Sequence, residues 1–196
     1  MQLTNRIRAI DIAIWLEGHK TLVICDTHLG YEQSMQQRGI LLPQTQLQQT
    51  IDRLRWILKQ VSPKRIVLNG DIKHEFGSVL DQEWNDCFKL IDFLKDNCDE
   101  LLFIKGNHDP LIEPIAKKKN VPVIKNLQLG NILITHGDEL PSEHTEVVII
   151  GHEHPAITLE DGVKYEKYKC FLTRKIKVKG KASLLIAQPS FHLLKP

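Results

Sequence analysis

Apolar residues recur along the chain in short runs, and most of these runs stop at a polar cluster. The clearest runs lie at residues 21–25, 65–68, 101–104, 131–134 and 146–150. Runs of this length, rich in valine, isoleucine and leucine, are typical of strands buried on both faces of a sheet. We therefore predict a sheet-based fold whose central strands end at the polar clusters.

Two segments show the spacing of three and four residues that is typical of an amphipathic helix. The first covers residues 45–61 and has Pro63 just beyond its end, where a helix cannot continue. The second follows the run at 65–68. Their apolar positions are Leu47, Ile51, Leu54, Ile57 or Leu58 and Val61 in the first, and Trp84, Phe88, Ile91 and Leu94 in the second.

The remaining pattern predicts strands late in the chain, with little room for helices between them. Residues 10–16 alternate as in a half-buried strand, and residues 30–43 are polar and irregular as in a loop. Residues 120–124 form another apolar run, and residues 163–187 are typical of strands in a hairpin that turns near Lys179-Gly180. Early helices and crowded late strands predict a mixed α/β class.

Composition limits the partners that the chain can have. A length of 196 residues, 42% of them hydrophobic and 26% charged, suits one globular domain, 1–196. The net charge is only +2, so any contact with nucleic acid must be local. The longest apolar runs are too short to span a bilayer, so we expect no membrane contact.

The cysteines point to a reducing compartment. Cys25, Cys87, Cys98 and Cys170 lie far apart and form no CxxC pair, so neither a disulfide framework nor a thiolate zinc site is expected. The first fifteen residues lack the charged-then-apolar pattern of a signal peptide. We therefore expect a cytoplasmic location.

Five polar clusters follow the apolar runs, and they carry the candidate chemistry. In α/β folds, ligands lie beyond the carboxyl ends of strands, so clusters that are distant in sequence can converge there. The glycines among them let the backbone turn and approach a ligand closely. The clusters are Asp26-Thr27-His28, Gly70-Asp71, Gly106-Asn107-His108-Asp109, Thr135-His136-Gly137 and Gly151-His152-Glu153-His154.

The residue types in these clusters suit divalent metals. Carboxylate oxygen and imidazole nitrogen without thiolate are typical ligands for Mn²⁺, Fe, Zn²⁺ or Co²⁺. Asp26 and His28 are alternate residues just past a strand, and so are His152 and His154, which would place each pair on one face. The same alternation directs Glu153 away from the metals.

The order of the motifs DxH, GD, GNHD, H and GHxH resembles the calcineurin-like metallophosphoesterases between Asp26 and His154. The similarity is greatest to small archaeal members and to bacterial phosphodiesterases associated with DNA ligase. It implies a four-layered α/β sandwich of two mixed sheets flanked by helices, without a capping domain. It also implies two divalent ions, Mn²⁺ first and Fe, Zn, Co or Ni as alternatives, and it leaves open a homodimer and DNA-repair partner proteins.

The resemblance also implies a role for each site residue. One metal would be held by Asp26, His28, Asp71 and His154, and the other by Asp71, Asn107, His136 and His152, so that Asp71 bridges the two ions. His108 would face the substrate without binding metal, and Asp109 would orient the ring of His108.

This site predicts metal-dependent hydrolysis of phosphoesters. Two close cations neutralise the phosphate and lower the pKa of a shared water, and the resulting hydroxide attacks phosphorus. His108 titrates in the range that suits protonation of the leaving oxygen. We expect a phosphodiesterase acting on nucleic acid or nucleotides. The alternatives are a phosphomonoesterase for a small molecule and a scaffold that has lost catalysis.

Substrate contacts are harder to predict from the pattern. Arg38 could meet a phosphate or be a solvated loop residue, and His74 could touch substrate or make local hydrogen bonds. A basic cluster near the end of the chain is either a nucleic-acid track with two interleaved tyrosines or a set of lysines protecting edge strands. The cluster comprises Lys164, Tyr165, Lys167, Tyr168, Lys169, Arg174, Lys175, Lys177, Lys179 and Lys181.

Overall fold

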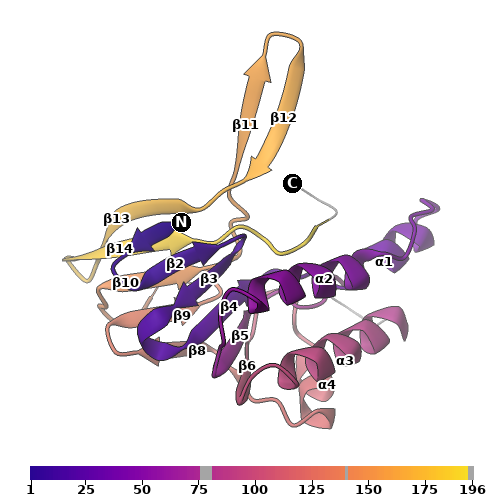
Figure 1. Ribbon diagram of the computed structural model, residues 1–196, viewed down its shortest axis with the longest axis horizontal. Coiled ribbons are helices and arrows are strands. Elements are labelled where there is room, and N and C mark those ends of the chain that lie inside the picture. The colour runs from indigo at the N-terminus through magenta and orange to yellow at the C-terminus, as the bar shows by residue number, and fades with distance from the viewer. Residues whose placement is uncertain (76–80, 140, 194–196) are drawn as a thin grey trace.

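The computed structural model describes residues 1–75, 81–139 and 141–193 (Figure 1). Within these ranges the helices are the short 3-10 helix η1 (Glu17–His19) and the α-helices α1 (Tyr31–Gln37), α2 (Gln46–Leu58), α3 (Asp81–Lys95) and α4 (Ile112–Lys118). No helix in these parts of the chain combines the length and apolar character needed to cross a bilayer.

The larger sheet has seven strands in sequence order. They are β1 (Gln2–Thr4), β2 (Ile7–Ile10), β3 (Ala13–Leu16), β4 (Thr21–Cys25), β5 (Arg65–Asn69), β6 (Glu100–Ile104) and β7 (Val123–Ile124). The first four form an antiparallel meander, whereas β4 to β7 run parallel. Cys25 pairs with Asn69, and Asn69 pairs with Ile104. The carboxyl ends of β4, β5 and β6 therefore lie level at one edge.

The second sheet has five strands in the order β13-β14-β10-β9-β8. Their bounds are β8 (Asn126–Leu129), β9 (Ile132–Thr135), β10 (Val147–Ile150), β13 (Leu172–Val178) and β14 (Lys181–Ala187). The inner strands β9, β10 and β14 run parallel, and the outer strands β8 and β13 are antiparallel to their neighbours. A separate hairpin, β11 (Ala156–Asp161) with β12 (Lys164–Lys169), projects from the body at the top of Figure 1.

Apolar side chains bury both faces of the seven-stranded sheet. One face packs against the five-stranded sheet through Ile14, Val23, Val67, Ile104, Ile134, Ile149 and Ile186. The other face packs against α2, α3 and α4 through Leu22, Ile24, Leu68, Phe103, Leu54, Ile57, Leu90, Leu94 and Ile115. The mixed α/β class with two mixed sheets and helices is thus confirmed, and these three helices cover the seven-stranded sheet.

The predicted apolar runs all contain strands, but residues 10–16 do not form one strand. Asp11 adopts a left-handed backbone with φ of +55° and makes a turn between β2 and β3. The alternation of apolar positions continues across this turn because the residues on both sides of it are buried. Periodicity alone could not locate the turn.

The prediction of a loop at residues 30–43 is wrong over α1 (Tyr31–Gln37) and holds for residues 38–43, which form no helix or strand. The buried residues of α1 include Glu32 and Ser34, which leave no apolar stripe in the sequence. Glu32 accepts hydrogen bonds from the backbone N–H groups of Thr45 (2.6 Å) and Gln46 (2.8 Å) at the start of α2. Polar contacts therefore hold this short helix in place. The sequence pattern also did not predict α4 or β8.

Candidate metal centre

The five polar clusters converge at the carboxyl ends of strands from both sheets. Asp26 directly follows β4, Asp71 lies two residues past β5, and Asn107 lies three residues past β6. His136 follows β9, and His152 lies just past β10. Because the two sheets pack face to face, these loops meet at one place, as the spacing predicted.

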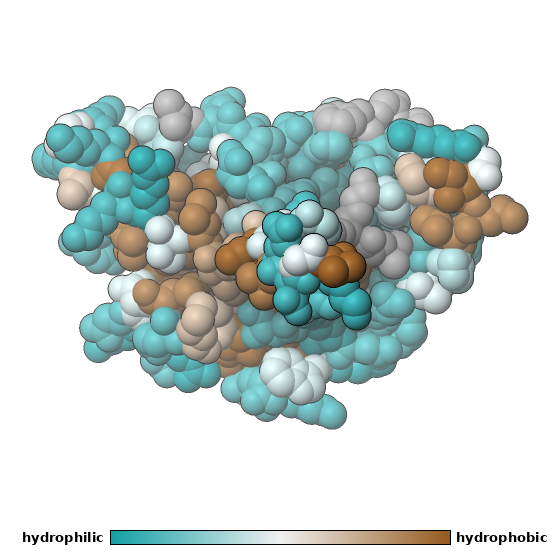
Figure 2. All heavy atoms as spheres, turned by 90° about the horizontal axis from the view of Figure 1, so that it is seen from above, coloured by the Kyte–Doolittle hydropathy of each residue, from teal (hydrophilic) through white to brown (hydrophobic). Residues whose placement is uncertain are grey.

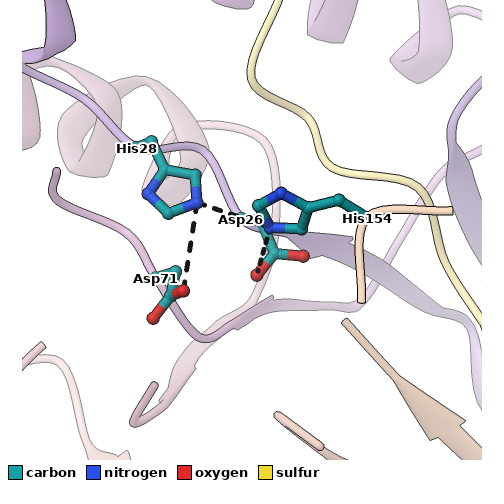
Figure 3. A group of neighbouring side chains, drawn as sticks. All are labelled: Asp26, His28, Asp71 and His154. Atoms are coloured by element: carbon teal, nitrogen blue, oxygen red, sulfur yellow. Dashed lines mark hydrogen bonds and ion pairs between the residues drawn. The ribbon is translucent and has the colours of Figure 1, made fainter. Parts of the chain in front are cut away.

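The first group of side chains consists of Asp26, His28, Asp71 and His154 (Figure 3). One potential ligand atom of each lies within 4.8 Å of those of the others. The His28 Nε2 is 3.4 Å from the His154 Nε2 and 3.9 Å from the Asp71 Oδ2, and the His154 Nε2 is 3.6 Å from the Asp26 Oδ1. Four lone-pair donors thus surround one small space.

The second group is made by Asp71, His136 and His152, with Asn107 beside them. The His136 Nε2 is 3.4 Å from the Asp71 Oδ1 and 2.9 Å from the Asn107 Oδ1. The His152 Nδ1 is 3.0 Å from the Asn107 Oδ1 and 3.1 Å from the His136 Nε2. Asp71 belongs to both groups and offers a different carboxylate oxygen to each.

These two groups fit a pair of divalent cations. Imidazole nitrogens that face each other at 3.4 Å and 3.1 Å need a proton or a cation between them. The donor set of carboxylate oxygens, imidazole nitrogens and one amide oxygen, without thiolate, suits borderline metals such as Mn²⁺, Fe, Co²⁺ or Zn²⁺.

Burial and the contacts between the candidate ligands together set the protonation of these side chains. It lowers the pKa of His28 to about 2, although the Asp71 carboxylate opposes this, so the ring is neutral and offers its lone pair. Burial alone would raise the pKa of Asp71, but the hydrogen bond and charge of His136 lower it to about 2. The same contact raises the pKa of His136 against its own burial. A cation would therefore replace a proton at this pair.

The backbone of the centre is strained. Five of the candidate ligands adopt the left-handed region: Asp26 (φ +53°), His28 (+44°), Asp71 (+47°), His152 (+57°) and His154 (+43°). This region is uncommon for residues other than glycine, and such residues cluster at functional sites, where the surrounding structure holds them. The strain directs these side chains toward one point.

Two glycines allow the loops to approach closely. A Cβ atom on Gly70 would lie 2.0 Å from the Nδ1 of His136, and Gly70 itself has φ of +73°. A Cβ on Gly106 would lie 2.3 Å from the backbone nitrogen of Asp71 and 2.4 Å from its Oδ1. Any side chain at Gly106 would therefore displace the shared carboxylate.

We expect the variant Gly106→Ala to bind Mn²⁺ at least about tenfold more weakly, because altering the groups that position a metal ligand lowers metal affinity by about that factor. Isothermal titration calorimetry on the metal-free chain would measure the affinity. Gly18→Ala is the matched control, because its nearest contact would be 3.8 Å away. Equal affinities for the two variants would show that the close approach does not position Asp71.

A hollow of about 240 Å³ opens beside the first group, and we call it the histidine hollow. The ring of His108 lies 5.2 Å from the ring of His28, and the Nδ1 of His108 is 3.2 Å from the carbonyl oxygen of His74. The residues that line the hollow are His28, His74, His108, His154, Lys169, Ser190 and His192. The structure thus places His108 and His74 next to the candidate ligands.

The hydrogen bonds of Asp109 that the structure describes come from the backbone rather than from the ring of His108. Its carboxylate is fully buried and accepts from the backbone N–H groups of Gly106 (3.1 Å), Ile72 (3.0 Å) and Lys73 (3.3 Å). Burial, with the charge of Asp71, raises its pKa to about 7. Asp109 ties the loop after β6 to the loop after β5, and so it supports the backbone around Asp71 and His108.

Arg38 lies outside this arrangement. Its side chain is 64% exposed, and it forms an ion pair with Glu75 at 3.8 Å. In contrast, Ser190 and His192 line the histidine hollow although the sequence pattern did not single them out, and Lys169 of the basic cluster lines it as well. His192 is 3% exposed, and its ring lies 5.8 Å from that of His28. No local spacing marks these residues, because they arrive from the end of β12 and from the segment after β14.

Comparisons with known proteins agree with this geometry. The sequence profile described as calcineurin-like phosphoesterase matches residues 19–170. The structure is similar to that of the nuclease MPE from Pseudomonas putida, with a TM-score of 0.67 and 20% identity over 93% of this chain and 80% of that one. At this level of identity the similarity concerns the fold alone. No curated protein matches the sequence.

Two further solved structures show weaker similarity. A protein of unknown function from Aquifex aeolicus has a TM-score of 0.43 and 18% identity over 67% of this chain and 77% of its own. A Vps29 mutant from Entamoeba histolytica has a TM-score of 0.38 and 18% identity, and the match covers 87% of this chain and 73% of the Vps29 chain. The profile match covers well over half of the sequence and includes every candidate ligand. The chain therefore belongs to the calcineurin-like phosphoesterase family, and this membership supports metal-dependent hydrolysis of phosphoesters.

Proposed function

We propose that the protein is a phosphodiesterase that acts on nucleic acid or nucleotide substrates through a two-metal mechanism, with Mn²⁺ as the preferred ion. The observation that carries this proposal is the pair of ligand groups that share Asp71, the first of which lines the histidine hollow through His28 and His154. A shared carboxylate is the feature that distinguishes a dinuclear centre from two separate sites.

In this proposal, each group of ligands holds one cation. Asp26, His28 and His154 would hold the first, Asn107, His136 and His152 the second, and Asp71 both. Two bound divalent ions neutralise phosphate oxygens and lower the pKa of a water, which supplies the nucleophile near neutral pH. The neutral Asn107 adds a ligand oxygen without adding negative charge.

His108 is proposed to protonate the leaving oxygen. The carbonyl oxygen of His74 can only accept, so the His108 Nδ1 that it contacts carries a proton. The His108 imidazolium would then donate from Nε2 to the substrate. His74 lines the same hollow and is proposed to contact substrate, whereas the ion pair of Arg38 with Glu75 favours a local role for that residue.

The surroundings of the centre favour an extended substrate. Besides the histidine hollow, a hollow of about 560 Å³ borders Asn107 on the side of the second group. A third, of about 710 Å³, shares Lys169 with the histidine hollow. A diester that continues on both sides of its phosphate can use such flanking space, whereas a small phosphomonoester cannot.

The test compares bis-p-nitrophenyl phosphate with p-nitrophenyl phosphate, each with Mn²⁺, Fe²⁺, Co²⁺, Ni²⁺ or Zn²⁺ added to the metal-free chain. The proposal predicts a higher kcat/KM for the diester, with the highest value in Mn²⁺. A higher value for the monoester would favour a phosphomonoesterase instead. The absence of metal-stimulated turnover on both would point to a scaffold.

A further inference from the structure

The hairpin of β11 and β12 stands apart from both large sheets. It begins at Ala156, two residues after the candidate ligand His154, and its strands pair only with each other among the described residues. Figure 2 looks down on it, and it stands out toward the viewer with both hydrophobic and hydrophilic side chains. Val163 is 90% exposed and Tyr165 70% exposed. A lone two-stranded hairpin is marginally stable, and exposed apolar groups often mark contact surfaces.

A hollow of about 710 Å³ lies at the base of this hairpin, and we call it the hairpin hollow. Its volume is in the range of sites that hold small molecules or segments of larger ones. The end of β12 contributes Lys167, Tyr168 and Lys169, and the body contributes Ile12, Arg53, Pro189 and Leu193. Lys169 also lines the histidine hollow, so the hairpin hollow borders the metal centre.

Three basic side chains line the hairpin hollow, and only one of them is held in an ion pair among the described residues. Arg53 is paired with Asp11. Neither Lys167 nor Lys169 takes part in any ion pair among the described residues. Lys169 is also half-buried, which lowers the pKa of its ammonium to about 8. A half-buried cation that forms no ion pair fits a ligand that brings its own negative charge.

We propose that the hairpin hollow binds the single-stranded nucleic-acid segment next to the phosphate that lies at the metal centre. Lys169 and Lys167 contact successive backbone phosphates, and the ring of Tyr168 stacks on a base. This inference rests on the proposed function, since it assigns the flanking part of the same substrate. Cations along the backbone with an interleaved aromatic ring are the elements by which proteins hold single strands.

The rest of the basic cluster does not share this placement. Arg174, Lys175 and Lys177 lie on β13, which is the outer strand of the five-stranded sheet. Lysine and arginine on an edge strand prevent pairing with other chains. The two interpretations of the basic cluster therefore apply to different parts of it, and the nucleic-acid track is confined to the end of β12.

The hairpin provides matched controls for a binding test. Lys164 and Tyr165 lie on the same strand as Lys167 and Tyr168 and are exposed, but they do not line the hairpin hollow. The variants Lys167→Ala and Tyr168→Ala should be compared with Lys164→Ala and Tyr165→Ala. Thermal unfolding would verify that all four variants fold.

Binding would be measured by fluorescence anisotropy of a labelled single-stranded DNA of about 12 nucleotides, in EDTA to prevent cleavage, between about 50 and 200 mM salt. We expect Tyr168→Ala to weaken binding about tenfold. We expect Lys167→Ala to lower the slope of log affinity against log salt by about 0.7. Both control variants should stay within about twofold of the unmodified chain.

Equal losses in the two pairs of variants would overturn the proposal in favour of diffuse attraction by the hairpin. Absence of DNA binding by the unmodified chain would also overturn it and would leave the hairpin as a surface for a protein partner. Hydrolysis of bis-p-nitrophenyl phosphate by the unmodified chain tests the proposed function separately. That activity can therefore stand while the assignment of the hairpin hollow fails.

Discussion

The variant Asp71→Asn is expected to lose bound metal and phosphoester hydrolysis together. Its carboxylate offers one oxygen to each ligand group, and an amide has only one oxygen to offer. Loss of a residue that merely supports a ligand already weakens metal binding about 10- to 100-fold. Loss of a shared ligand should therefore weaken metal binding by more than about 100-fold. Elemental analysis after dialysis would give the metal content, and bis-p-nitrophenyl phosphate would give the rate.

The control for this variant is Asp86→Asn. Asp86 is also buried, at 8% exposure, but it lies on α3 outside the metal centre. The Asp86→Asn variant should retain both metal and activity. This result would separate the effect of losing a metal ligand from the effect of losing a buried charge. An Asp71→Asn protein with the metal content of the unmodified chain would refute the shared position of Asp71.

The variant His108→Ala is expected to keep its metal and to lose about 10²- to 10⁴-fold in kcat, the usual contribution of a positioned acid. The ring of His108 lines the histidine hollow, and its backbone N–H donates a hydrogen bond to the Asp71 Oδ1 at 2.9 Å. Alanine keeps that N–H. Metal binding and catalysis should therefore separate at this residue.

The leaving group provides a sharper test of the role of His108. A p-nitrophenolate leaves without much help, whereas an alkoxide needs a proton, so the loss in kcat should be greater for a diester with an alkyl leaving group. His144→Ala, on the exposed segment before β10, is the control for removal of a histidine. Equal losses for both leaving groups would argue that His108 binds the phosphate without transferring a proton.

The sequence predicted the part of the site that depends on strand ends. The runs that became β4, β5, β6, β9 and β10 are apolar on both faces, so their ends were visible, and the residues after them were named as candidates. Parallel pairing then brings those ends to one edge. The ends of these strands can be predicted because a strand that is buried on both faces accepts almost only apolar residues.

Other parts of the site left no such trace. The buried contacts of α1 use Glu32 and Ser34, so no apolar period marked that helix. His192 reaches the histidine hollow through tertiary packing from a segment without a motif, and the basic cluster that contains Lys169 gives no sign that this lysine lies beside the metal centre. The GNHD motif marks Asp109 as a candidate, but its hydrogen bonds to the backbone of Gly106 and Ile72 depend on how two loops lie side by side.

A stoichiometric titration would distinguish a centre in which two cations share Asp71 from a site that holds a single ion. Mn²⁺ would be added to the metal-free chain while calorimetry counts bound ions and bis-p-nitrophenyl phosphate reports the rate. The shared centre predicts two ions per chain, with hydrolysis rising only as the second ion binds. Full activity at one ion per chain would rule out a catalytic centre that requires two ions.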